Sequence, residues 1–306
     1  MSPAARGHIA MLAFSGLVAG SFPLGAAAAP HVSPLALNAV RFALASAILG
    51  VAVLATRPRG APARPAAARP GAAPWRYLLL GAIFACYFVL MFEGLKTAMP
   101  VSAAAVFTLT PPATAAFAWL LLRQVTGPRV ATALALGAAG ALWVIFGGDP
   151  ASLARLQVGR GEAVYFLGCL AHALYTPMIR LLNRGERALV FAFGTMVAAC
   201  AILWVVGMPA ILATDWATRP ASVWIAIGYT AVFASAVTFT LLQYGSLRLP
   251  ASKVMAYTYL VPAWVALWQV ALGGDWPSAR LLPGVALTLL ALALLLREDA
   301  PDPPPR

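Results

Sequence analysis

Long apolar stretches alternate with short polar turns along the whole chain of 306 residues. A helix needs about 20 mostly apolar residues to cross a bilayer. Ten stretches reach that length, and the pattern therefore predicts an all-α integral membrane protein with ten transmembrane helices. We expect them at residues 9–28, 33–55, 75–94, 98–122, 129–147, 159–182, 188–207, 221–244, 251–272 and 279–297.

One of these stretches has a counterpart in the second half of the chain. A shift of 151 positions places Gly94 on Gly245 and Pro111 on Pro262. Each copy is a polar turn followed by an apolar span with proline near its middle, where proline removes a backbone hydrogen bond. In lipid, such a break persists only where protein or a water-filled cavity satisfies the freed carbonyl. We therefore predict that Pro111 and Pro262 are helix breaks beside a binding site at mid-membrane.

The repeat divides the chain into two halves of five spans each. We expect the first five-helix repeat at 1–148 and the second at 157–297. Because five is odd, the second half enters the membrane inverted relative to the first. Segments 57–74 and 298–306 are rich in proline and lack the hydrophobic content to pack, so they are expected to be a cytoplasmic linker loop and a disordered tail.

Composition excludes a soluble fold and supports one orientation. Hydrophobic residues make up 62% of the chain and charged residues 10%, far from the balance of a soluble domain. The net charge of +12 comes from arginines in the turns, which does not suggest nucleic-acid binding. With both termini inside, fourteen basic residues lie inside and five outside. The bias predicts a multi-pass protein of the cytoplasmic (inner) membrane with both termini cytoplasmic, and we interpret the N-terminal apolar run as a retained span.

Several stretches carry a family resemblance. FSGLVAGSFPLGAAAAPHVSPLALNAVRFALA from Phe14, YFVLMFEGLKTAMPVSAAAVFTLTPP from Tyr87 and LRLPASKVMAYTYLVP from Leu247 are similar to the EamA-type branch of the drug/metabolite transporter (DMT) superfamily. The resemblance implies two inverted EamA repeats and export of small metabolites, often amino acids. It also implies a central cavity lined by the first, third, fourth, sixth, eighth and ninth helices. Arg123 and Gln124 depart from the acidic residue that often closes the fourth helix of this family.

The sixth span carries a polar face. Glu162, Tyr165, Cys169, His172 and Thr176 fall within an 80° stripe of the helix. An ionisable side chain near mid-depth is costly and marks a functional site by default, so His172 and Tyr165 are candidate substrate-binding residues. The alternative is a neutral histidine that bonds a neighbouring helix, and the sequence leaves both interpretations open.

The other candidates come from spans that carry aromatic or hydroxyl groups. Tyr257 and Trp264 lie on one stripe of the ninth span beside Pro262, where packing is the alternative interpretation. The substrate-binding set is completed by Tyr87, Thr110 and Phe22. Arg41, in the outer third of the second span, is expected to be a structural anchor more than a carboxylate site.

No nucleotide-binding, zinc-protease or serine-hydrolase motif is present, so we expect no catalytic residues, no metal and no cofactor. The leading hypothesis is a secondary transporter that exports small organic metabolites by alternating access. The alternatives are a membrane-embedded enzyme that modifies lipid and a passive channel. The expected partners are a small-molecule substrate and the bilayer, with proton coupling through His172 as a further hypothesis.

The charge bias predicts a labelling pattern. A cysteine introduced at Arg64 is expected to resist an impermeant thiol reagent on intact cells, and one introduced at Asp215 is expected to react. Labelling at position 64 but not at 215 would reverse the orientation.

Overall fold

The structure is a computed structural model that describes residues 2–56, 73–155 and 158–296. All regular elements in these ranges are helical, and ten of the helices or helix runs are long and apolar enough to span a membrane. The prediction of an all-α protein with ten transmembrane helices is confirmed. Most of the expected linker at 57–74 and the whole expected tail at 298–306 lie outside the described residues.

Each span is one helix or a run of short helices. The first five spans are α1 (Pro3–Ala19) with α2 (Ser21–Ala28), α3 (Pro34–Ala55), α4 (Trp75–Gly94), α5 (Pro100–Phe107) with α6 (Thr110–Leu122), and α7 (Pro128–Ile145). A short α8 (Pro150–Ala154) follows. The last five are α9 (Arg160–Leu182), α10 (Ala188–Leu212), α11 (Ala221–Ala231) with η3 (Val232–Val237) and α12 (Thr238–Ser246), α13 (Ala251–Ala256) with η4 (Tyr257–Leu260) and α14 (Val261–Ala271), and η5 (Ala279–Leu281) with α15 (Leu282–Leu296).

The first span begins earlier than the expected residue 9. Ser2 caps the helix by accepting a hydrogen bond from the backbone N–H of Ala5 at 3.1 Å. Pro3, whose fixed φ suits the first turn, follows it. Arg6 and His8 are therefore helical, because a good cap extends the helix beyond its apolar part.

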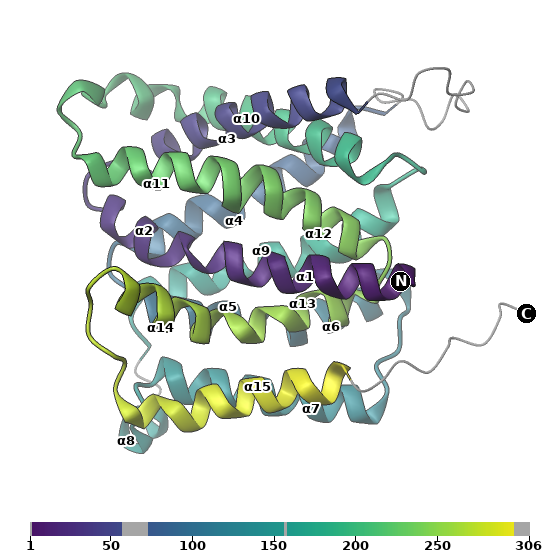
Figure 1. Cartoon of the computed structure of the whole chain (residues 1–306), viewed down its shortest axis with the longest axis vertical. Coiled ribbons are helices and arrows are strands. Elements are labelled where there is room, and N and C mark those ends of the chain that lie inside the picture. The colour runs from purple at the N-terminus through teal and green to yellow at the C-terminus, as the bar shows by residue number, and fades with distance from the viewer. Residues whose placement is uncertain (1, 57–72, 156–157, 297–306) are drawn as a thin grey trace, which may run out of the picture.

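The helices lie side by side, and both the N-terminus and the end of α15 are at one end of the bundle (Figure 1). We call this end the terminal face and the other end the opposite face. Many side chains on the outside of the bundle are large and apolar: Val205 is 78% exposed, Val51 67% and Leu282 63%. An exterior of this kind matches hydrocarbon and would be unfavourable in water.

The two halves interlock through equivalent helices. The third span of each half packs on the first span of the other, α4 on α9 and α12 on α1. The remaining helices pair in the same manner, with α3 against α10 and α7 against α15. The repeated glycine ends the third span of each half: a Cβ on Gly94 would lie 2.6 Å from the carbonyl oxygen of Gly161, and one on Gly245 would lie 2.6 Å from the sulfur of Met11. The recurrence of glycine at a shift of 151 therefore has a packing reason at both places.

A buried ion pair ties α4 to the turn between α9 and α10 at the terminal face. Arg76 donates to a carboxylate oxygen of Glu186 at 2.7 Å and to the carbonyl of Leu182 at 2.5 Å. The hydroxyl of Tyr77 donates to the same carboxylate at 3.2 Å, and the backbone N–H of Arg184 donates to its other oxygen at 2.6 Å. Burial alone would raise the pKa of Glu186, but the hydrogen bonds from Arg76 and from the backbone lower it below its ordinary value.

We expect the substitution Arg76→Met to lower the thermal unfolding temperature of the purified protein by several degrees. Loss of one partner leaves an uncompensated buried charge, at a cost of about 3 kcal/mol. The double variant Arg76→Met/Glu186→Leu serves as the control and is expected to recover much of the loss, since it leaves no orphaned charge. Equal losses in the two variants would contradict a stabilising ion pair.

The lowered pKa of Glu186 also gives the sign of the pH dependence of folding stability. The ion pair contributes fully above the unfolded-state pKa of about 4.3, and its contribution is lost as pH falls through the lower folded-state pKa. Unfolding scans from pH 7 to pH 3 are expected to show a steeper loss of stability in the unmodified protein than in the double variant. If stability falls equally with pH in the two proteins, the ionised form of Glu186 does not stabilise the fold through its partners.

Candidate functional site

A small closed cavity lies inside the bundle between the two halves. Its volume is about 10 Å³, and it is lined by Phe14, Val18, Phe84, Tyr87, Phe88, His172, Ala234, Thr238, Phe239 and Leu242. This volume is close to the least that holds one water molecule. Residues of α1, α4, α9, η3 and α12 form the wall, which is mainly aromatic.

His172 is the polar group of this wall without a partner. It is 2% exposed, and neither of its ring nitrogens has a hydrogen-bond partner among the described residues. Its ring stacks on Tyr87, with centroids 4.4 Å apart, and lies 5.4 Å from the ring of Phe107. Burial of an unpaired polar group is unfavourable, and such groups in proteins usually have an identifiable role. A molecule in the cavity with a donor or an acceptor would pair one of the two ring nitrogens, and a molecule with both would pair the two.

Four of the residues predicted from sequence gather here: His172 itself, with Tyr87, Tyr165 and Phe22. The hydroxyls of Tyr87 and Tyr165 are 3.1 Å apart, so α4 and α9 are hydrogen-bonded in the core. Phe22 packs edge-on against Tyr165, with ring centroids 6.0 Å apart. A fifth predicted residue, Thr110, donates its hydroxyl hydrogen to the carbonyl of Phe107, whose ring faces His172.

Of the seven predicted residues, His172 and Tyr87 line this cavity, and Tyr165, Phe22 and Thr110 do not. The remaining two, Tyr257 and Trp264, lie on another part of the interface. The hydroxyl of Tyr257 lies 3.0 Å from Nδ1 of His8, toward the terminal face. Trp264 faces α1, where a Cβ on Gly16 would be 3.9 Å from its ring. The aromatic stripe of the ninth span therefore faces the first helix, along a different part of the interface between the halves.

Both spans that carry the paired prolines are interrupted. In the fourth span, α5 ends at Phe107 and α6 begins at Thr110, with Pro111 in its first turn. In the ninth span, the 3₁₀ segment η4 stands directly before Val261 and Pro262. A threonine hydroxyl donates to a carbonyl three residues earlier at each place: Thr108 to Ala105 at 2.6 Å, and Thr258 to Met255 at 2.8 Å. The carbonyls that the prolines leave without their usual helical donor are those of Phe107 and Thr258, four residues before Pro111 and Pro262. The first accepts the hydroxyl of Thr110 and the second accepts the backbone N–H of Val261.

A third irregular span escaped the sequence interpretation, which treated 221–244 as one continuous helix. Residues Val232–Val237 form a π-helix, η3. Within it, the carbonyl of Ala234 accepts a hydrogen bond from Arg41 at 2.9 Å. Ser235 accepts a second bond from the same guanidinium at 2.7 Å. A π-helix has no strong sequence signal, because it depends on the side chain that binds its freed carbonyl.

Sequence interpretation also missed most of the aromatic wall. Phe84 and Phe88 flank Tyr87 on α4, and Phe239 packs on Phe84 with ring centroids 4.3 Å apart. The spacing of Phe84, Tyr87 and Phe88 at i, i+3 and i+4 places the three on one helix face and was available as a signal. In so apolar a sequence, many such stripes face lipid, which made this one hard to single out.

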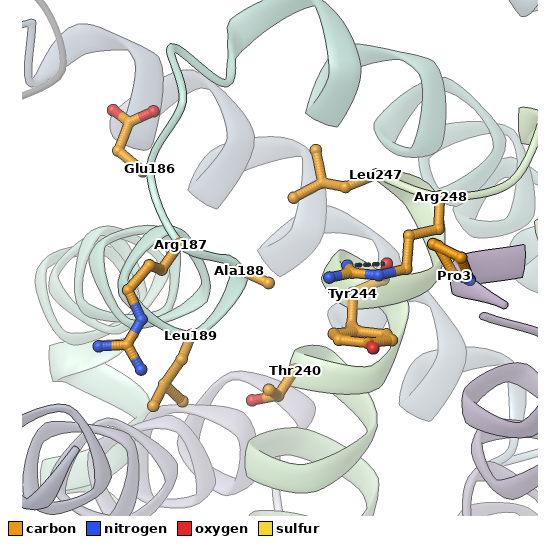
Figure 2. Close-up of a pocket in the computed structure, with 9 residues that line it drawn as sticks. All are labelled: Pro3, Glu186, Arg187, Ala188, Leu189, Thr240, Tyr244, Leu247 and Arg248. Carbon is orange, nitrogen blue, oxygen red and sulfur yellow. Dashed lines mark hydrogen bonds between the residues drawn. The ribbon is translucent and has the colours of Figure 1, made fainter. Parts of the chain in front are cut away.

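A larger cavity of about 600 Å³ opens at the terminal face (Figure 2). It lies between the start of α10 and the end of α12, and its walls are mostly apolar. Arg248 lies 3.4 Å above the ring of Tyr244 and donates to the Tyr244 carbonyl at 3.0 Å. Thr240 and Tyr244 of α12 line this cavity, whereas Thr238 and Phe239 line the central one. The two cavities share no lining residue, and we regard the smaller one as the candidate site.

The described parts of the chain contain no group of three or more His, Cys, Asp or Glu side chains that could hold a metal ion. The titratable side chains that line the central cavity are His172 and Tyr87, whose rings stack on each other.

Comparisons with known proteins agree with the architecture. The model of the EamA-like transporter family matches residues 5–146 and 159–297. A protein described as "Uncharacterized transporter YyaM" from Bacillus subtilis (strain 168) is 27% identical over 267 residues, which cover 87% of this chain and 86% of that protein. A solved structure described as "Crystal structure of protein" has a TM-score of 0.70 and 22% identity, over 98% of this chain and 99% of the other. The two matched segments together cover nearly the whole chain, which therefore belongs to the EamA-like transporter family.

Proposed function

We propose that this protein is a secondary transporter that exports small organic metabolites, such as amino acids or similar amphipathic compounds, across the cytoplasmic membrane by alternating access at the central cavity. The observation that carries the proposal is His172, a buried imidazole without partners on the wall of a closed cavity between the two halves. Membership of a transporter family supports the general activity.

The closed cavity favours a transporter over a passive channel. A channel needs a continuous path, and a cavity of about 10 Å³ holds no more than a water molecule. A metabolite enters such a site only when helices separate on one side. The alternative of a lipid-modifying enzyme lacks support, since the described residues of the site include no carboxylate or nucleophile pair.

Contacts at both ends of the bundle suggest how access alternates. Toward the opposite face, Ser102 donates to Glu162 at 2.8 Å, and Gly94 lies against Gly161. Toward the terminal face, Arg180 donates to the carbonyl of Ser246 at 2.7 Å and also to that of Leu249. Both sets of contacts involve α9, which carries His172 between them. We propose that each set opens in turn, with the two halves acting as inverted repeats.

The proposal is tested by counterflow in liposomes. Purified protein is expected to accelerate uptake of a labelled amino acid into vesicles preloaded with the same unlabelled compound, and the uptake is expected to saturate. Failure of every member of a broad panel of amino acids and amphipathic drugs to exchange would contradict the proposed substrate class. Flux that never saturates would favour the channel.

The helix breaks give a matched pair of variants. Pro262→Ala is expected to reduce exchange at least several-fold, with a smaller effect on folded protein in the membrane, because it restores a regular helix beside α1. Pro209→Ala serves as the control, since Pro209 lies in α10 with its side chain exposed on the outside of the bundle. Full activity of Pro262→Ala would remove this break from the mechanism.

His172 offers a test of proton coupling. An imidazole that changes protonation when substrate binds would let an imposed proton gradient drive accumulation. His172→Gln is expected to abolish gradient-driven accumulation while counterflow is retained, since glutamine still forms hydrogen bonds but does not titrate. If the unmodified protein exchanges a substrate but never concentrates it under a gradient, transport is facilitated diffusion and His172 is a binding or packing residue.

A further inference from the structure

Arg41 is a fully buried cation in the membrane-spanning part of the protein. It is 0% exposed, although it lies in the interior of α3, seven residues from its first residue. The buried ion pair of Arg76 with Glu186 and the exposed pair of Lys96 with Glu93 do not involve Arg41. A charge at this depth in a bundle is costly and is usually paired with an opposite charge or placed at a functional site.

The groups that hold Arg41 are neutral. Its Nε donates to the hydroxyl of Ser235 at 2.7 Å, one Nη donates to the carbonyl of Ala234 at 2.9 Å, and the other donates to the amide oxygen of Asn38 at 3.4 Å. These bonds use three of the five N–H donors of a guanidinium. The charge also lies 3.9 Å above the ring of Phe88. Dipoles and a ring stabilise the cation, but they leave its net charge uncompensated.

This charge stands directly behind the wall of the central cavity. Phe88 and Ala234, which contact the guanidinium, both line the cavity. The surroundings are aromatic and aliphatic, and in a region of low dielectric constant a charge acts over longer distances than in water. Arg41 therefore gives the cavity a positive potential that no described side chain of its lining offsets.

The potential has a consequence for substrate choice. Aromatic walls without an acid ordinarily suit a cation. Here one of the rings, that of Phe88, already lies under the guanidinium of Arg41. A second cation in the cavity would therefore be repelled by that guanidinium. A carboxylate would instead meet an opposite charge and a polar partner in His172.

We propose that Arg41 is the specificity-determining residue that gives the central cavity its preference for substrates with a carboxylate. This inference rests on the proposed transport function and refines its substrate class: small amphipathic acids and zwitterions bind, and the corresponding amines without a carboxylate are rejected.

The test measures binding of matched probes to purified protein in detergent, because the uncharged forms of acids and amines cross vesicles unaided. The probes are phenylalanine, 3-phenylpropionate and phenethylamine, with leucine, 4-methylpentanoate and isopentylamine as an aliphatic set. In the unmodified protein, the dissociation constant of each amine is expected to exceed that of its acid at least tenfold. The Arg41→Met variant is expected to bring this ratio close to one.

Two control variants separate charge from packing. Arg41→Lys keeps the charge, and Ser235→Ala removes one hydrogen bond without removing the charge, so both are expected to keep most of the preference. If Arg41 had only a structural role, Arg41→Met and Ser235→Ala would each weaken the binding of acids and of amines by the same factor. If Arg41→Met does not fold, the ratios in the unmodified protein and in Arg41→Lys decide, and ratios near one in both overturn the proposal.

The outcomes distinguish this inference from the transport proposal. Binding of the amines as tightly as the acids overturns the role of Arg41 and leaves a transporter of other specificity. Binding of none of the six probes at millimolar concentration overturns the proposed substrate class of the transporter and the role of Arg41 with it.

Discussion

The satisfaction of backbone carbonyls in a medium without water is the constraint on which this structure depends. An unbroken helix meets it automatically, and a broken one needs a donor at each freed carbonyl. Irregular segments interrupt the fourth, eighth and ninth spans, and each has a donor: the hydroxyl of Thr110 on the carbonyl of Phe107, the backbone N–H of Val261 on that of Thr258, and the guanidinium of Arg41 on that of Ala234 in the π-helix. The donor at the π-helix is the one that carries a charge.

The three irregular segments also surround the interface between the halves. Phe107, at the end of α5, faces His172, and η3 contributes Ala234 to the cavity wall. The segment η4 packs on α1 and holds Tyr257 beside His8. Regular helices make the outer parts of the bundle, α7 with α15 and α3 with α10. The irregular segments lie inside and the regular helices outside because a helix that faces lipid has no neighbour to supply a missing hydrogen bond.

The sequence predicted that the protein is all-helical, the number of its spans and the positions of most of them. It could do so because a helix that crosses the bilayer needs a continuous stretch of about 20 apolar residues. It singled out His172 and Tyr165, because their stripe on α9 is an unusual polar face among apolar ones, and their part in substrate binding stays a prediction. It did not predict the contacts of Arg41, whose partners Ala234 and Ser235 are 193 and 194 positions away. A contact of that kind depends on the packing of whole helices, and no local pattern encodes it. The stripe of Tyr257 and Trp264 illustrates the same limit, since helical spacing gives the face of a side chain but not the neighbour that it meets.

The interlocked packing of the halves has a consequence for assembly in the cell. The first helix to enter the membrane, α1, packs on α12 of the eighth span, and the third span, α4, packs on α9 of the sixth. Residue 7 cannot meet its partner Leu249 until more than two hundred further residues have been synthesised and inserted. The glycine and alanine surfaces of the early helices therefore remain against lipid during most of translation. The central cavity, whose lining comes from the first, third, sixth and eighth spans, is complete only after the eighth span has entered the membrane.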